Sequence, residues 1–360
     1  MKTVSFESDY NNGVHPEVLR RLVETNDNRS LSYGDDEWSE LARKKIRDAI
    51  GCPEAAIFFL VGGTQANATV IDALLRPYGA VVAVETAHIN VHESGAVEAS
   101  GHKVVTLPSH EGRMDAGELH DYLRRFFADP TWQHMAVPGM VYVTMPTELG
   151  TIYHREELAH ISDVCREYDL RLFLDGARLG YGLTAEGCDM DLPWLAQHCD
   201  AFYIGGTKVG ALCGEAVVFP KGAPEGFFTH VKAHGALLAK SRLAGVQFDA
   251  LFTDGLYLRI SRHAIDMAMR LREVFIQAGV EIKPSPTNQQ FVVLENDVMG
   301  RLMETVRFET WAPVDERHTL CRFVTSWATT DEELGALREG IGKILNYYCP
   351  LNHNPHSPTS

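Results

Sequence analysis

The sequence lacks any apolar run that approaches the roughly 20 residues needed for a membrane-spanning helix. It contains neither the GxxxxGK(S/T) phosphate loop nor the GxGxxG dinucleotide fingerprint. Its seven cysteines form no CxxC pair and no cysteine–histidine pattern with zinc spacing. We therefore expect no membrane span, no nucleotide site of either kind and no metal ligand set.

Basic residues are also scarce. The chain has 33 lysines and arginines against 48 aspartates and glutamates, a formal net charge of -15 at pH 7. Because phosphates would be repelled, we expect neither nucleic acid nor an anionic membrane as partner. The first nine residues contain no apolar segment typical of a signal peptide. The absence of such a segment predicts a cytoplasmic protein. The odd number of cysteines, which suits reduced thiols, supports the same prediction.

The 360 residues exceed one small hydrophobic core. From residue 55 to 219, short apolar runs typical of buried strands alternate with segments of helical periodicity, which predicts an α/β fold with a mostly parallel sheet of seven strands. The expected strands are 55–61, 80–84, 103–107, 140–145, 171–174, 202–205 and 216–219. Helices are expected between them, for example at 92–100, 115–127 and 155–168.

Past residue 219 the pattern becomes that of a smaller α+β region. One long helix is expected at 256–279 and a last one at 331–345, with short strands at 280–282, 290–294 and 322–325. These patterns predict four parts, which are an N-terminal segment (1–17), a large domain (18–249), a small domain (250–346) and a flexible tail (347–360).

A lysine flanked by glycines is the first candidate for chemistry. Lys208 follows an apolar run and Gly205-Gly206, and Gly210 lies two residues beyond it. Such glycines leave the lysine accessible and let a flat ligand approach the backbone. An amine in a partly apolar pocket has a lowered pKa and becomes a nucleophile toward aldehydes. Lys208 is therefore either a Schiff-base lysine or an ordinary solvated lysine on a loop.

Two further motifs follow predicted strands. Gly63 and Thr64 stand where a strand gives way to a helix, and free backbone N–H groups at such a position bind phosphate, although the same turn also occurs without a ligand. Asp175 lies at the carboxyl end of a buried strand, where it can hold a protonated heterocyclic nitrogen. Arg178 can grip a carboxylate there, or pair with Asp175 to stabilise the loop.

His88 follows another strand, where an imidazole can stack on a flat ring, transfer protons or serve only structure. A phosphate loop, an aspartate after one strand and a lysine after a later strand occur in the order needed to hold pyridoxal phosphate. We therefore predict pyridoxal 5'-phosphate as the cofactor.

These residues together resemble the threonine aldolase group of fold-type-I pyridoxal-phosphate enzymes, often called beta-eliminating lyase-like. The resemblance runs from about Phe6 to about Leu345. It depends on six stretches in the family's order, namely YGDD at 33–36, GTQAN at 63–67, AH at 87–88, LDGAR at 174–178, GTK at 206–208 and RFVTS at 322–326.

The resemblance implies roles around the cofactor. Lys208 would form the Schiff base, Asp175 would pair with the ring nitrogen, and His88 would stack on the ring. Gly63 and Thr64 would bind the phosphate.

The resemblance also implies substrate and subunit contacts. Arg178, Arg322 and Ser8 would bind the substrate carboxylate, with Arg178 also beside the cofactor. Tyr33 would lie near the site on a loop that completes a neighbouring subunit's site, and a basic residue near Lys240 or Arg242 would reach a neighbour's phosphate. Such enzymes are usually homotetramers built as dimers of dimers.

Two segments depart from the better-known members. Residues 145–150 read MPTELG where many relatives carry Glu-Asn-Thr-His, so a polar contact to the cofactor ring is either lost or supplied by another group. Residues 8–13 read SDYNNG in place of the more usual Ser-Asp-Thr-Val. Both segments border the expected pocket.

The function implied is a retro-aldol cleavage. The substrate would be L-threonine, L-allo-threonine or a related β-hydroxy-α-amino acid such as phenylserine, and the products would be glycine and an aldehyde. His88, or a water that it holds, is the candidate base for the β-hydroxyl proton. The alternatives are another pyridoxal-phosphate enzyme, either an aminotransferase or a β-eliminating lyase, and a non-catalytic binding protein on the same fold. A metal-dependent aldolase is the most distant alternative.

Overall fold

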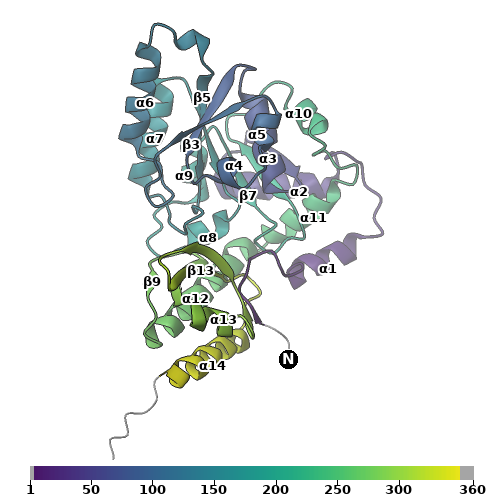
Figure 1. The fold of residues 1–360 in the computed structure, drawn as a ribbon. Helices are drawn as coiled ribbons and strands as arrows, with labels where there is room; N and C mark the ends of the chain where they lie inside the picture. The colour runs from purple at the N-terminus through teal and green to yellow at the C-terminus, as the bar shows by residue number, and fades with distance from the viewer. Residues whose placement is uncertain (1–3, 349–360) are drawn as a thin grey trace, which may run out of the picture.

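A computed structural model of the chain describes residues 4–348. Within these residues the largest element is a seven-stranded sheet with the order β2-β8-β7-β6-β5-β3-β4 (Figure 1). Only β8 runs antiparallel to its neighbours, so the predicted mostly parallel seven-stranded sheet is confirmed. The strands are β2 (Ala56–Leu60), β3 (Gly79–Val84), β4 (Lys103–Leu107), β5 (Val137–Thr144), β6 (Arg171–Asp175), β7 (Ala201–Gly205) and β8 (Glu215–Phe219).

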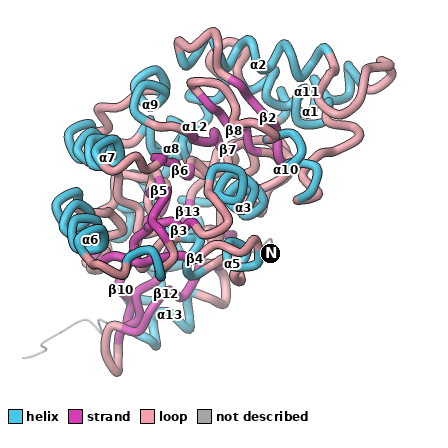
Figure 2. The backbone as a smooth tube through the Cα atoms, turned by 90° about the horizontal axis from the view of Figure 1, so that it is seen from above, coloured by secondary structure: helices cyan, strands magenta, loops and turns pink. Residues whose placement is uncertain are grey.

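Helices cover both faces of this sheet, as right-handed crossovers between parallel strands require. Figure 2 shows α6, α7 and α9 on one side and α3 and α5 on the other. The helices of this region are α1 (Pro16–Thr25), α2 (Glu37–Ile50), α3 (Gly63–Leu74), α4 (His88–Val91), α5 (Ala96–Ala99), α6 (Ala116–Ala128), the 3-10 turn η1 (Trp132–His134), α7 (Arg155–Glu167), α8 (Leu179–Thr184), α9 (Leu192–His198), α10 (Phe227–Ala233) and α11 (Arg242–Leu251).

The C-terminal region is smaller and builds its own layers. A four-stranded antiparallel sheet has the order β12-β13-β10-β9, and a two-stranded parallel pair joins β1 to β11. These strands are β1 (Val4–Ser5), β9 (Ile282–Lys283), β10 (Gln289–Glu295), β11 (Val306–Arg307), β12 (Glu309–Pro313) and β13 (His318–Val324). The helices α12 (Leu256–Gln277), α13 (Asn296–Leu302) and α14 (Asp331–Tyr348) pack beside them.

The described residues form two main apolar clusters, one under each region. Helix α12 contributes to both, with Ile265 in the first cluster and Met267 in the second. Phe6 also joins the second cluster, so the N-terminal segment packs against the C-terminal region (Figure 1). We propose that the clusters mark a large and a small domain, and the boundary between residues 249 and 250 stays a prediction.

Three expectations need comment. The single helix predicted at 92–100 is wrong, because Ser94 and Gly95 adopt left-handed backbone conformations that separate α4 from α5. Strand β12 was not predicted, since its sequence ETWAP is partly exposed and ends in a proline at the sheet edge. In the predicted tail, residues 347 and 348 end α14, and residues 349–360 lie outside the described part of the chain.

Within residues 4–348, no helix is long and apolar enough to cross a membrane. The six cysteines of the described residues are all free thiols.

Candidate active site

The ends of five strands and the start of β8 meet at one edge of the large sheet. The carboxyl ends of β2, β3, β5, β6 and β7 point the same way, and β8 begins there with Glu215. A cavity of about 310 Å³ opens at this edge. Its lining includes Gly63, Thr64, His88, Asp175, Arg178 and Lys208, which the sequence had placed after separate strands. Ligands bind at this edge in open α/β sheets.

The loops after β6 and β7 pass each other very closely. A Cβ atom added to Gly176 would lie 1.9 Å from the carbonyl oxygen of Tyr203, and one on Gly205 would lie 2.2 Å from that of Ala177. Only glycine permits this approach. The approach brings the segment that carries Asp175 beside the segment that carries Lys208.

The carboxylate of Asp175 is buried and accepts hydrogen bonds at both oxygens. Its Oδ2 accepts from Tyr142 Oη at 2.6 Å and Asn67 Nδ2 at 2.9 Å, and its Oδ1 accepts from Tyr203 Oη at 2.5 Å and the Ala177 N–H at 2.9 Å. Burial raises the pKa of both tyrosines well above the usual range, so their hydroxyls remain donors. The carboxylate is thus held in one orientation in the cavity wall.

A second chain of hydrogen bonds connects Asp175 to His88. Asn67 Nδ2 also donates to Glu93 Oε1 at 2.7 Å, and the same oxygen lies 2.7 Å from His88 Nδ1. Because Glu93 Oε1 acts as an acceptor toward Asn67, His88 Nδ1 carries the hydrogen of this contact. The lone pair of a neutral His88 ring is therefore on Nε2.

The N-terminus of α3 also lines the cavity. Its N-cap is Gly62, which offers no side-chain oxygen, and the first main-chain bond runs from the Ala66 N–H to the Gly62 carbonyl. Within the described residues, the N–H groups of Gly63 and Thr64 have no acceptor. Free N–H groups and the dipole at a helix N-terminus can bind an anion, and these two residues line the cavity.

Lys208 lines the same cavity. Burial lowers the pKa of its amine to about 8, and the positive charge of Arg178 adds to the effect. Glu215 fixes the lysine's loop, since Oε2 accepts from the Gly206 N–H at 3.1 Å and Oε1 from Thr207 Oγ1 at 2.8 Å. Burial raises the pKa of Glu215 to about 8. The lowered pKa therefore makes the neutral amine, which is the nucleophilic form, available at a lower pH than for an ordinary lysine.

Glu148 is a further carboxyl in the cavity, from the segment that departs from the better-known relatives. Its Oε1 accepts from the backbone N–H of His88 at 3.1 Å, and its Oε2 accepts from Thr144 Oγ1 at 3.1 Å. Burial raises its pKa to about 6. A carboxyl with this pKa, beside His88, can take up or release a proton near neutral pH.

A family model described as beta-eliminating lyase matches residues 6–311. The chain belongs to the beta-eliminating lyase family. The low specificity L-threonine aldolase of Pseudomonas aeruginosa is 31% identical over 351 residues, which cover 95% of this chain and 98% of that protein. The structure of Leishmania major threonine aldolase is 35% identical with a TM-score of 0.90, and the match covers 95% of this chain and 99% of that chain.

The family and the enzyme class expected from the sequence are thereby confirmed. Aspartate aminotransferase from Thermus thermophilus, at 16% identity and a TM-score of 0.67, covers 95% of this chain and 91% of its own and shares the fold alone. These matches also confirm the fold-type-I architecture.

The two arginines expected to hold a substrate carboxylate already have partners. Arg178 lines the cavity and forms a bidentate pair with Asp9, with Nε at 2.7 Å from Oδ2 and Nη2 at 3.1 Å from Oδ1. Arg322 does not line the cavity. It donates to Gln289 Oε1 at 2.9 Å and to Glu309 Oε2. Burial and the charge of Arg178 lower the pKa of Arg322, so the two cations are close neighbours.

Three other predicted residues lie away from the cavity lining. Ser8 is buried and donates to Asn11 Oδ1 at 2.9 Å. Tyr33 and Lys240 are exposed and adjacent, because the Tyr33 N–H donates to the carbonyl of Ala239 at 3.3 Å. Tyr33 lines a separate surface pocket of this lyase.

Several residues of the site were not assigned from the sequence. They share a role in fixing a neighbour, and they are Asp9, Asn67, Glu93, Tyr142, Glu148, Tyr203 and Glu215. Asn67 ends the GTQAN stretch, Glu148 lies in the MPTELG segment and Asp9 in the SDYNNG segment, so a sequence signal existed for these three. The others depend on contacts that only the fold creates.

Proposed function

We propose that the protein is a pyridoxal-phosphate-dependent aldolase that cleaves L-threonine, L-allo-threonine or a related β-hydroxy-α-amino acid, such as phenylserine, to glycine and an aldehyde. The observation that carries the proposal is the meeting of the Lys208 amine, the Asp175 carboxylate and an uncapped helix N-terminus in one cavity. The names of the relatives from Pseudomonas aeruginosa and Leishmania major support the substrate class.

The residues present fit this cofactor. Lys208 would hold its aldehyde, Asp175 its ring nitrogen, His88 the face of its ring, and the N–H groups of Gly63 and Thr64 its phosphate. Each of these five residues lines the same cavity. When bound, pyridoxal 5'-phosphate supplies an electron sink for the bond that breaks at the substrate Cα.

Lys208 and its neighbours prepare the amine for exchange with the substrate. The lowered pKa gives the lysine a larger neutral fraction near physiological pH than an ordinary lysine has, and the neutral amine is the form that attacks an aldehyde. The hydrogen bonds from Gly206 and Thr207 to Glu215 fix the loop from which the lysine extends. The amine can then return to the same position after each turnover.

Asp175 provides a fixed negative charge. Four hydrogen bonds, two of them from tyrosines, prevent the carboxylate from rotating. A charge that is already oriented stabilises developing positive charge without reorganisation during the reaction. We propose that this preorganisation keeps the ring nitrogen protonated.

Arg178, backed by Arg322, would orient the substrate through its carboxylate. Asp9 holds the plane of the Arg178 guanidinium, and the second cation increases the positive potential on that side. The orientation of the carboxylate determines which Cα bond is aligned for cleavage.

His88 is our candidate for the base that accepts the β-hydroxyl proton, directly or through a water. Its contact with Glu93 leaves the Nε2 lone pair available. Glu148, bonded to the His88 backbone, is the nearest further carboxyl that can receive a proton near pH 6.

We also propose a cytoplasmic homo-oligomer, a dimer of dimers. Tyr33 and Lys240 lie side by side on exposed segments outside their own cavity, which supports a role for them beside a neighbouring subunit's site. The expectation of Lys240 as a phosphate ligand in trans belongs to this assembly-level proposal, whereas Ser8 as a ligand of the substrate carboxylate stays a separate prediction.

The deciding experiment is a product analysis. The purified protein, supplied with cofactor and a 2-oxo acid as amino acceptor, is incubated with L-threonine, L-allo-threonine and phenylserine, and the aldehyde, glycine, ammonia and 2-oxo acid formed from each substrate are measured. Equal yields of aldehyde and glycine are expected. A 2-oxo acid with ammonia would indicate β-elimination, a 2-oxo acid without ammonia an aminotransferase, and no product with any substrate a binding protein.

A further inference from the structure

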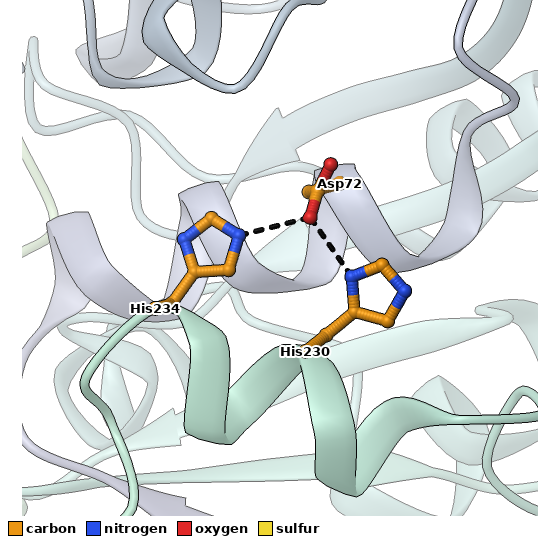
Figure 3. A group of neighbouring side chains, drawn as sticks. All are labelled: Asp72, His230 and His234. Atoms are coloured by element: carbon orange, nitrogen blue, oxygen red, sulfur yellow. Dashed lines mark hydrogen bonds and ion pairs between the residues drawn. The ribbon is translucent and has the colours of Figure 1, made fainter.

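Three metal-binding side chains meet on the surface, away from the cavity. Asp72 extends from α3, His230 from α10, and His234 directly follows α10 (Figure 3). Asp72 Oδ2 lies 2.8 Å from His230 Nδ1 and 2.9 Å from His234 Nε2. A separation of four residues places the two imidazoles on one face of the helix. Asp72 is about 13 Å along α3 from the cavity end of that helix.

The positions of these side chains are held by contacts that do not involve Asp72 Oδ2. At the start of α10, the ring of Phe227 packs 4.7 Å from that of Phe58 and 4.6 Å from that of Phe219. The carbonyl of His234 accepts from Gln65 Nε2 at 3.4 Å, which ties the end of α10 to α3. The cluster is therefore preorganised by the packing of two helices.

A buried histidine lies beside the other oxygen of the carboxylate. His102 Nε2 lies 3.4 Å from Asp72 Oδ1, and His102 Nδ1 lies 3.2 Å from the carbonyl of Gly79. Residues that orient a metal-binding carboxylate in this way form the outer shell of a metal centre and contribute to its affinity.

The donor atoms also have the spacing of a metal site. All three lie within 4.8 Å of one another. Two ligands at about 2.0–2.1 Å from one tetrahedral zinc ion are about 3.4 Å apart, so the two contacts to Asp72 Oδ2 need to lengthen by only about 0.5 Å to admit an ion. The side chains of Asp72, His230 and His234 are 25%, 35% and 22% exposed, so an ion can enter from solvent and water can complete its coordination.

We propose that Asp72, His230 and His234 bind one divalent transition-metal ion, with Zn²⁺ the best match, and that the ion clamps α10 to α3. Imidazole and carboxylate together suit Zn²⁺ and its first-row neighbours, whereas Mg²⁺ and Ca²⁺ prefer oxygen ligands alone. When the ion binds, it takes the place of the two ring hydrogens that now face Asp72, and each neutral ring keeps its hydrogen on the other nitrogen. The role is structural and independent of the proposed aldolase reaction.

The test starts with the cofactor-loaded protein after treatment with a chelator. Titration with Zn²⁺ in a calorimeter should give one equivalent bound per chain, and the melting temperature should rise on binding. Co²⁺ should give the weak visible bands of nitrogen and oxygen ligands. A strong sulfur-to-cobalt band would assign the ion to cysteines and overturn the proposal.

Matched variants locate the site. Asp72→Asn and His234→Gln should each weaken Zn²⁺ affinity by more than about 10-fold, because each removes a direct ligand. The control is His110→Gln, which removes an exposed histidine paired with Glu118 outside the cluster and should leave affinity unchanged. If Asp72→Asn fails to fold, the Zn²⁺ affinity of His234→Gln and the cobalt spectrum of the wild type still test the site. Absence of stoichiometric binding by the wild type, or variants that bind as it does, would overturn the site.

Discussion

Asp9 holds the guanidinium of Arg178 in a bidentate ion pair in the wall of the cavity, with one hydrogen bond of 2.7 Å and one of 3.1 Å. Burial alone would raise the pKa of Asp9, but the charges of Arg178 and Lys208 outweigh it and hold the pKa below its usual range. Asn288 Nδ2 donates to the same carboxylate at 2.9 Å. The pair therefore joins the N-terminal segment, the loop after β6 and the start of the C-terminal sheet.

The first prediction concerns this pair. Asp9→Asn removes the charge that fixes the Arg178 guanidinium, so KM for L-threonine should rise by about 10-fold or more, as expected for loss of a charge-assisted hydrogen bond. Steady-state kinetics check this, with Glu7→Gln as the control because Glu7 is exposed on the same segment. An unchanged KM in Asp9→Asn would contradict a positioning role for Asp9.

The second prediction concerns Asp175. Asp175→Asn keeps the size of the side chain but removes its charge, so kcat/KM should fall by roughly 10²-fold or more. Asp121→Asn, on the exposed face of α6, serves as the control. Circular dichroism should show both variants folded. Near-normal kcat/KM for Asp175→Asn would remove the aspartate from the chemistry.

The third prediction concerns the pH dependence of cofactor capture. The amine of Lys208 must be neutral to react, and its pKa is lowered from the usual 10.5 to about 8. The rate at which the cofactor-free protein takes up pyridoxal 5'-phosphate should therefore rise as pH increases to about 8 and level off above it. Stopped-flow absorbance measures this rate. A rate that continues to climb toward pH 10 would show that the pKa is not lowered.

The fourth prediction concerns Glu148 and stability. Its pKa is raised from 4.5 to about 6, so the folded state binds its proton more tightly than the unfolded state does. The stability contributed by this proton is complete below pH 4.5 and is lost as pH rises through about 6. Glu148→Gln lacks this dependence, so its stability relative to the wild type should increase by about 2 kcal/mol between pH 4.5 and pH 7.

Denaturant unfolding at several pH values measures that difference. A matched control is Glu85→Gln, which changes an exposed carboxyl in the loop after β3. Parallel stability curves for wild type and Glu148→Gln would mean that the buried carboxyl has an ordinary pKa.

Much of the fold and the outline of the site follow from local sequence. The strands of the large sheet are short apolar runs, and Asp175 and Lys208 each follow such a run, so their meeting at one sheet edge was predictable. The break between α4 and α5 was missed because Ser94, not only Gly95, adopts the left-handed conformation.

The contacts that hold side chains in place at the two sites could not be predicted from local sequence in the same way. The pairing of Asp9 with Arg178 spans 169 residues, and that of Asp72 with His230 spans 158. No periodicity or motif connects positions so far apart, and only the folded arrangement of helices and strands brings them together.

The central claim is that Lys208 bonds covalently to the cofactor. The direct measurement is to reduce the yellow, cofactor-loaded protein with borohydride, digest it and locate the phosphopyridoxyl group by mass spectrometry. The group should be found on the peptide that contains Lys208, and Lys208→Ala should lose both the label and the visible absorption. A label on another lysine, or none on the wild type, would contradict the proposed site.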